Sequence, residues 1–262
     1  VIKNLARAIV KSARKDPFLF MLRVVVTLLL VMVVLAKLGW WSPDKVFVLI
    51  LMFGLLWWRQ RAFIVRFVPF LGLLMLYFSL KPLADELNTN VHFVEMIRFD
   101  RWMFGGELPT IWLQERLWHH QPSWLDYYFY ILYGLHFLLP PLVGILLWRV
   151  RDRLYWPFVW TICGSSFLAF IIYIIFPAAP PWMASEQGYI TEPFTRIAID
   201  IWASLNVHNF SQIYSDISPN PVAAVPSLHS AFPLIMAIFL VKAFGLRRMW
   251  WVLLCPLSML VG

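Results

Sequence analysis

The chain has 262 residues, of which 61% are hydrophobic and only 14% are charged. A soluble domain carries about 25% charged residues, so this composition excludes an ordinary soluble protein and indicates an integral membrane protein. The formal charge of +8 occurs without a basic block or a zinc-ligand spacing. It therefore fits anionic lipid headgroups and argues against a nucleic-acid partner.

Apolar runs of the length that crosses a bilayer, about 20 residues, divide the chain. They lie at 19–41, 45–58, 62–81, 124–148, 154–176 and 228–246, and a seventh begins at Met249. The sequence therefore predicts an all-α polytopic bundle of about six to seven transmembrane helices with additional interfacial helices. Residues 1–18 space their basic side chains at helical intervals, so we expect a cytoplasmic interfacial segment there and a membrane-embedded domain over 19–262.

Lys and Arg gather in every second connection between these runs. They occur in the N-terminal segment and at 59–66, 149–153 and 242–248. Basic connections face the cytoplasm, so the long loops 82–123 and 177–227, which hold most of the acidic residues, are predicted to lie outside. We expect a multi-pass protein of the plasma (inner) membrane with a cytoplasmic N-terminus.

His229 lies in "VPSLHS", where the second outer loop enters an apolar run. Pro226 cannot continue a helix backwards, and Ser227 is a favourable N-cap. The next backbone N–H groups would then be helix-terminal donors, and together with the helix dipole they make an anion site. An imidazole beside that site could protonate an oxygen that leaves phosphorus. A capped helix with an interfacial histidine of no function is the alternative.

Four segments carry a family resemblance. "PSLHS" resembles the middle signature of the type 2 phosphatidic acid phosphatase superfamily, usually written Pro-Ser-Gly-His. "FPAAPPW" (176–182), "DRWMFGGELPTIWLQ" (100–114) and "KPLADEL" (81–87) resemble segments of its inositol phosphorylceramide synthase branch, the aureobasidin-resistance type. The resemblance extends from about residue 77 onward.

The resemblance implies a membrane enzyme with the helical fold of that superfamily. It would transfer a phosphate-containing headgroup, such as phosphoinositol, from a phospholipid to a lipid alcohol through a phosphohistidine, on the extracytoplasmic face. A lipid-phosphate or polyprenyl-phosphate phosphatase of the same superfamily is the alternative. A lipid transporter or lipid-binding protein is the alternative from another class. A transporter would place polar groups near the midplane of paired repeats, whereas here they collect at the outer rim.

The family reaction implies roles for particular residues. His229 would protonate the leaving alkoxide, and Ser227 would help to hold the phosphate. The nucleophilic histidine and its aspartate belong to a third signature, which would follow Gly262. The run from Met249 to Gly262 is shorter than the roughly 20 residues of a span. We therefore expect a continuation that delivers both residues to the outer face, and an inactive portion without it.

Two cations are candidates for binding the substrate phosphate. The superfamily's first motif, with Lys seven residues before an Arg-Pro, does not occur in this chain. Lys81, at the outer end of the third run, is the nearest replacement, and a snorkelling lysine is the alternative. Arg101 stands beside Asp100, and an intramolecular ion pair is the alternative to a headgroup contact.

His136 lies inside the fourth apolar run, where a polar residue is costly and usually faces the bundle interior. Pro140 and Pro141 kink the same run and free carbonyls nearby. A helix–helix hydrogen bond or a place in the lining of a lipid pocket would explain this histidine.

No cluster of Asp, Glu, His or Cys in the outer loops has metal-ligand spacing. We therefore expect no metal and no cofactor. The expected partners are the phospholipid and lipid-alcohol substrates and the membrane, without nucleic acid.

Overall fold

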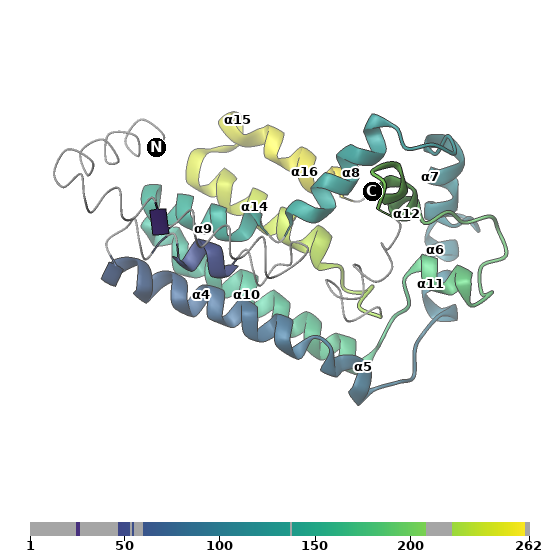
Figure 1. Ribbon diagram of the computed structural model, residues 1–262, viewed down its shortest axis with the longest axis horizontal. Coiled ribbons are helices and arrows are strands. Elements are labelled where there is room, and N and C mark those ends of the chain that lie inside the picture. The colour runs from purple at the N-terminus through teal and green to yellow at the C-terminus, as the bar shows by residue number, and fades with distance from the viewer. Residues whose placement is uncertain are drawn as a thin grey trace. The chain divides into compact units, whose positions relative to one another are not determined.

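The computed structural model describes the residues 25–26, 47–52, 54, 60–136, 138–207 and 222–259, and Figure 1 shows its ribbon. The chain divides into two compact units, residues 1–75 and 76–262. The predicted interfacial segment 1–18 and most of the first two apolar runs lie outside the described residues.

The first unit contains the beginning of α4 (Gln60–Leu80). The rings of Phe63 and Phe67 stack with their centroids 4.8 Å apart, and both side chains are buried. A Cβ added at Gly54 would lie 2.0 Å from the ring of Phe63. The absence of a side chain at Gly54 therefore lets the second apolar run approach the aromatic face of α4.

The regular elements in the described residues of the second unit are all helices, and isolated β-bridges occur in the connections between them. After α4 come α5 (Leu83–Leu87), α6 (Val94–Met103), α7 (Pro109–Leu117), α8 (Trp124–Leu135), α9 (Leu139–Val150), α10 (Asp152–Ile175), α11 (Pro181–Glu186), α12 (Ile197–Ser204), α14 (Leu228–Phe244), α15 (Leu246–Met249), the 3-10 turn η1 (Trp250–Leu253) and α16 (Leu254–Ser258). The long helix α10 packs against α9, α14 and α5, and α12 packs against α8. The prediction of an all-α architecture is therefore confirmed for the described part of the chain.

Two described helices are long and apolar enough to cross a membrane. They are the Arg61–Leu80 part of α4 and the whole of α10, and a third candidate arises if α8 and α9 are one bent span. Helix α14 is also apolar but shorter, at 17 residues. These helices support the membrane assignment, and the count of six to seven spans stays a prediction.

The fourth apolar run is broken where its prolines predict a kink. Helices α8 and α9 meet at an angle of 61°. Pro140 and Pro141 lie in the first turn of α9, and they have no N–H to donate to the carbonyls one turn earlier. His136 therefore stands at the C-cap of α8, at a helix end rather than in the middle of a continuous helix.

The last apolar run is also interrupted. Helix α14 ends at Gly245, whose φ of 89° is accessible to glycine, and α15 begins at the next residue. The chain then passes through η1 before α16. Pro256 in α16 cannot donate to the carbonyl of Val252 inside η1, which accounts for the tighter turn at this position.

The two long loops at 82–123 and 177–227 pack together in a small core of their own within the described residues. This core joins α7 to α11 and the loop after it, and it consists of Leu108, Ile111, Ala184 and Ile190. The rings of Phe93 and Tyr189 stack beside it at 4.5 Å. The side chain of Gln114 adds two hydrogen bonds to the backbone of Thr195, of 2.8 and 3.0 Å. The described parts of the two loops therefore fold together rather than forming loose connections.

Candidate functional site

The "FPAAPPW" segment is held between two other segments by backbone contacts. Isolated parallel bridges link Ala178 to His92 and to Ala223. The N–H of His92 donates to the carbonyl of Pro177 at 2.8 Å, and the N–H of Ala178 donates to that of Val222 at 3.0 Å. The segment supplies no cation. Instead it serves as a backbone template that fixes the residues leading into "PSLHS".

A tyrosine fixes the start of that motif from a second direction. The hydroxyl of Tyr173, near the end of α10, donates to the carbonyl of Pro226 at 2.7 Å. The hydroxyl of Tyr173 also interacts electrostatically with that of Tyr77 of α4. Both tyrosines are almost fully buried, so the position of Pro226 depends on two helices as well as on the template.

Ser227 is the N-cap residue of α14, as the sequence predicts. Its backbone carbonyl accepts the hydrogen bond from the N–H of Ala231 at 3.0 Å. Its hydroxyl is exposed and makes no capping hydrogen bond within the described part of the chain. This hydroxyl is therefore accessible to a ligand at the start of the helix.

The structure brings the two candidate histidines into contact. The ring centroids of His136 and His229 lie 3.9 Å apart, with the planes inclined by 50°. The ring of Tyr133 stacks on the imidazole of His229 at 4.1 Å and 10°. His136 is 1% exposed, and its Nδ1 is hydrogen-bonded to the carbonyl of Tyr133. This bond lies within the end of α8, so it is not the helix–helix bond considered from the sequence.

Lys81 belongs to the same cluster. It follows the last residue of α4 and interacts electrostatically with both His136 and His229. The structure therefore favours a place beside the imidazoles over a side chain that merely snorkels. A cation at this place is suited to bind a phosphate oxygen.

Asp85 is a neighbour of this site that the sequence reasoning missed. It lies one helical turn after Lys81, and its Oδ1 is buried without a hydrogen-bond partner among the described residues. Burial raises the pKa of Asp85 to about 6, although the charge of Lys81 acts in the opposite direction. The i,i+4 spacing of the two residues is a signal that could have indicated this pair.

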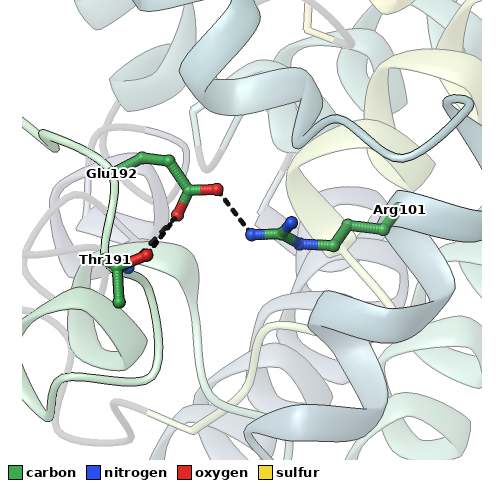
Figure 2. A network of polar contacts seen from close by, with 3 residues as sticks. All are labelled: Arg101, Thr191 and Glu192. Atoms are coloured by element: carbon green, nitrogen blue, oxygen red, sulfur yellow. Dashed lines mark hydrogen bonds and ion pairs between the residues drawn. The ribbon is translucent and has the colours of Figure 1, made fainter.

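Arg101 lies in a different arrangement. Its guanidinium pairs with the carboxylate of Glu192 at 2.5 Å, as Figure 2 shows. The same carboxylate also accepts from the N–H and the hydroxyl of Thr191, at 3.1 and 3.3 Å. The ion-pair alternative is therefore realised, with Glu192 rather than Asp100 as the partner. The pair links α6 to the loop between α11 and α12.

The described residues contain no group of three or more His, Cys, Asp or Glu side chains that could hold a metal ion. Independence from metal ions and cofactors stays a prediction for the whole protein.

Comparison with known proteins decides the family. A profile of the PAP2 superfamily matches residues 94–261. The chain belongs to the PAP2 superfamily. The matched part of this PAP2 chain contains Arg101, His136, Ser227 and His229, whereas Lys81 precedes it.

A curated protein matches part of the chain. The chain is 33% identical over 123 residues to "Phosphoinositol dihydroceramide synthase" of Bacteroides thetaiotaomicron, a match that covers 44% of this chain and 38% of the relative. The chain therefore matches well under half of that relative's length. No solved structure matches the chain.

The geometry defines what this PAP2 chain can do. An imidazole, an ammonium group and an exposed hydroxyl meet near the first turn of an apolar helix. Such a set can neutralise a phosphate and deliver a proton beside it.

Proposed function

We propose that this chain forms part of a membrane enzyme that transfers a phosphate-containing headgroup from a phospholipid to a lipid alcohol. The name of the Bacteroides relative supports phosphoinositol as the headgroup and a ceramide-like alcohol as the acceptor. The reaction takes place on the extracytoplasmic face, where the positive-inside rule puts the two long loops.

The observation that carries this proposal is the meeting of Lys81, His136 and His229 at the start of α14. Lys81 and the hydroxyl of Ser227 bind the phosphate oxygens. Backbone N–H groups in the first turn of α14 add donors, and the helix dipole favours the negative charge. His229 stands beside this phosphate position and acts as the general acid.

The reaction has two balanced steps. In the first, a nucleophilic histidine forms a bond to phosphorus, and the bond from phosphorus to the diacylglycerol oxygen breaks. His229 gives its proton to that leaving oxygen, so diacylglycerol departs as a neutral alcohol. In the second step, the acceptor hydroxyl forms a bond to phosphorus and gives its proton to His229, the bond from phosphorus to the histidine nitrogen breaks, and the nucleophilic histidine is free again. The nucleophile and its orienting aspartate are those of the third signature that the family resemblance implies.

The test uses the full-length protein in detergent or proteoliposomes, a phospholipid with a labelled headgroup and a long-chain lipid alcohol. Label that appears in a new lipid supports the transferase. Label that is released as a water-soluble phosphate shows instead that water is the acceptor, and the protein is then a phosphatase. A full-length protein that does neither with any phospholipid or lipid phosphate contradicts the enzymatic proposal.

The control is the same protein with His229→Ala. Its label should stay in the starting phospholipid. Turnover by this variant at the wild-type rate would contradict the proposed role of His229 even where transfer itself is observed.

A further inference from the structure

The end of α8 presents two rings to the same neighbour. Tyr133 and His136 are three positions apart in the sequence, so they lie on one face of the helix. The helix ends at Leu135 and turns by 61° into α9. The Nδ1 of His136 is hydrogen-bonded to the carbonyl of Tyr133, which fixes its ring in the last turn. The break in the fourth apolar run therefore creates a rigid corner made of two rings.

The imidazole of His229 lies against this corner. One of its faces is covered by Tyr133, at 4.1 Å and nearly parallel, and the ring of His136 contacts it at 3.9 Å. Rotation of His229 about its χ2 angle would force its ring edge into one of these neighbours. The corner therefore restricts the direction in which the nitrogen atoms of His229 point.

His136 itself is poorly placed to touch a substrate. Its side chain is 1% exposed, whereas the Tyr133 side chain is 37% exposed. A residue that is buried behind the imidazole acts through that imidazole. The proposed function gives Lys81 and Ser227, rather than His136, direct contact with the phosphate.

We infer that His136 and Tyr133 are positioning residues that hold His229 in the orientation from which it protonates the leaving oxygen. The inference rests on the proposed function and adds to it the device that aims the general acid. A general acid works only when its proton lies within hydrogen-bond reach of the accepting oxygen. Misplacement by about 1 Å can reduce a rate by about 10²-fold.

The test exploits the leaving group. An alkoxide such as that of diacylglycerol needs a proton, whereas a 4-nitrophenolate leaves without one. We therefore compare kcat and KM on the natural phospholipid with the activity on the 4-nitrophenyl ester of the same headgroup phosphate. Activity on the ester is taken as the first-turnover rate of nitrophenolate release, because the second step uses His229 with either substrate. The full-length protein is assayed as wild type, His136→Phe, His136→Asn, Tyr133→Leu and His229→Ala.

The expected result for His136→Phe is a fall of about 10- to 100-fold in kcat on the phospholipid. KM should stay within about twofold, and activity on the nitrophenyl ester should fall less than about threefold, because that leaving group needs no aimed proton. His136→Asn keeps a hydrogen-bonding group near the Tyr133 carbonyl and should lose less. His229→Ala should also lose more activity on the phospholipid than on the nitrophenyl ester, and its loss on the phospholipid should be larger than that of His136→Phe. Ile131→Ala, at an exposed position of α8, is the control and should behave as wild type.

Three outcomes would overturn the inference. Equal losses on both substrates would show that His136 only maintains the fold, and a rise confined to KM would show that it lines the lipid pocket. Wild-type rates in every His136 and Tyr133 variant would show that these two side chains do not orient His229 for catalysis. If His136→Phe fails to fold, which gel filtration in detergent reports, His136→Asn and Tyr133→Leu decide the question.

Failure of the inference can be told apart from failure of the proposed function. If the loss of activity in His229→Ala is larger on the phospholipid than on the nitrophenyl ester, and the His136 and Tyr133 variants show no such difference, only the positioning role is wrong. If His229→Ala loses equal activity on both substrates, His229 is not the general acid, and the proposed function itself needs revision.

Discussion

The hydroxyl of Tyr173 donates a 2.7 Å hydrogen bond to the carbonyl of Pro226, so a buried side chain of α10 holds the first residue of "PSLHS". The bond connects a helix long enough to span a membrane with the loop that precedes His229. The backbone bridge of Ala178 to Ala223 lies just before this loop. The hydrogen bond from Tyr173 is therefore the next contact that holds the chain, three residues after the bridge. The position of Pro226, three residues before His229, therefore depends on a buried side chain of α10.

Tyr173→Phe should lower kcat about tenfold without loss of folded protein. One lost hydrogen bond costs about 1 kcal/mol, and a displaced general acid reduces the rate further. The measurement is headgroup transfer by the full-length enzyme, with thermal unfolding in detergent as the check on folding. Tyr128→Phe is the matched control, because it also loses a hydroxyl contact, the one of 3.0 Å to Ser258. Equal kcat losses in both variants would refute a specific role for Tyr173.

His229→Ala should reduce turnover by about 10²- to 10⁴-fold, the usual loss for a positioned general acid. Ser227→Ala should be milder, because the backbone N–H donors at the start of α14 remain. Steady-state transfer rates of the two variants, measured side by side in the full-length protein, provide the comparison. A larger loss in Ser227→Ala than in His229→Ala would reverse the roles proposed for the two residues.

Arg101→Ala and Glu192→Ala should have small and similar effects, because the partners are partly exposed at 40% and 36%. Exposed ion pairs contribute about 0.2–1 kcal/mol, and the double variant should lose little more than either single one. Thermal unfolding and KM for the phospholipid are measured for all four members of the cycle. If Arg101 binds substrate phosphate instead, Arg101→Ala raises KM strongly and Glu192→Ala does not.

Asp85→Asn should change how stability depends on pH. Burial raises the pKa of Asp85 in the folded protein from 3.8 to about 6, against the opposing effect of Lys81. Between about pH 4 and pH 6 the unfolded chain loses this proton while the folded chain keeps it, so the free energy of unfolding falls as the pH rises. The variant has no such proton, so its unfolding temperature should fall less across that window. Glu86→Gln is the adjacent exposed control, and a wild-type slope in Asp85→Asn would contradict the shift.

The outer position of the site can be tested by chemical labelling in intact cells. Glu186→Cys and Arg151→Cys are placed singly in a background without Cys163 and Cys255, and both positions are exposed. An impermeant thiol reagent added outside should label Glu186→Cys and spare Arg151→Cys, because basic turns stay in the cytoplasm. The opposite pattern would overturn both the orientation and the outer active site.

The sequence by itself determined the features that depend on nearby residues. Hydrophobic composition and run length specified an all-helical membrane protein, because every backbone group in a bilayer must be hydrogen-bonded internally. The Pro226–Ser227 pair predicted where α14 begins, and Pro140 with Pro141 predicted the break between α8 and α9. Capping and proline effects act within about one helical turn, so a reader of the sequence can find them.

Only the tertiary structure decided which distant residues meet. The contact of His136 with His229, the partner of Arg101 and the bridges of Ala178 each join segments far apart in the chain. Nothing in the local pattern distinguishes Glu192 from another loop acid, or His136 from a histidine that bonds to another helix. These pairings arise because α10 packs against α9 and α14 and because the two long loops share a core. Packing is a property of whole surfaces, which the order of residues along one segment does not reveal.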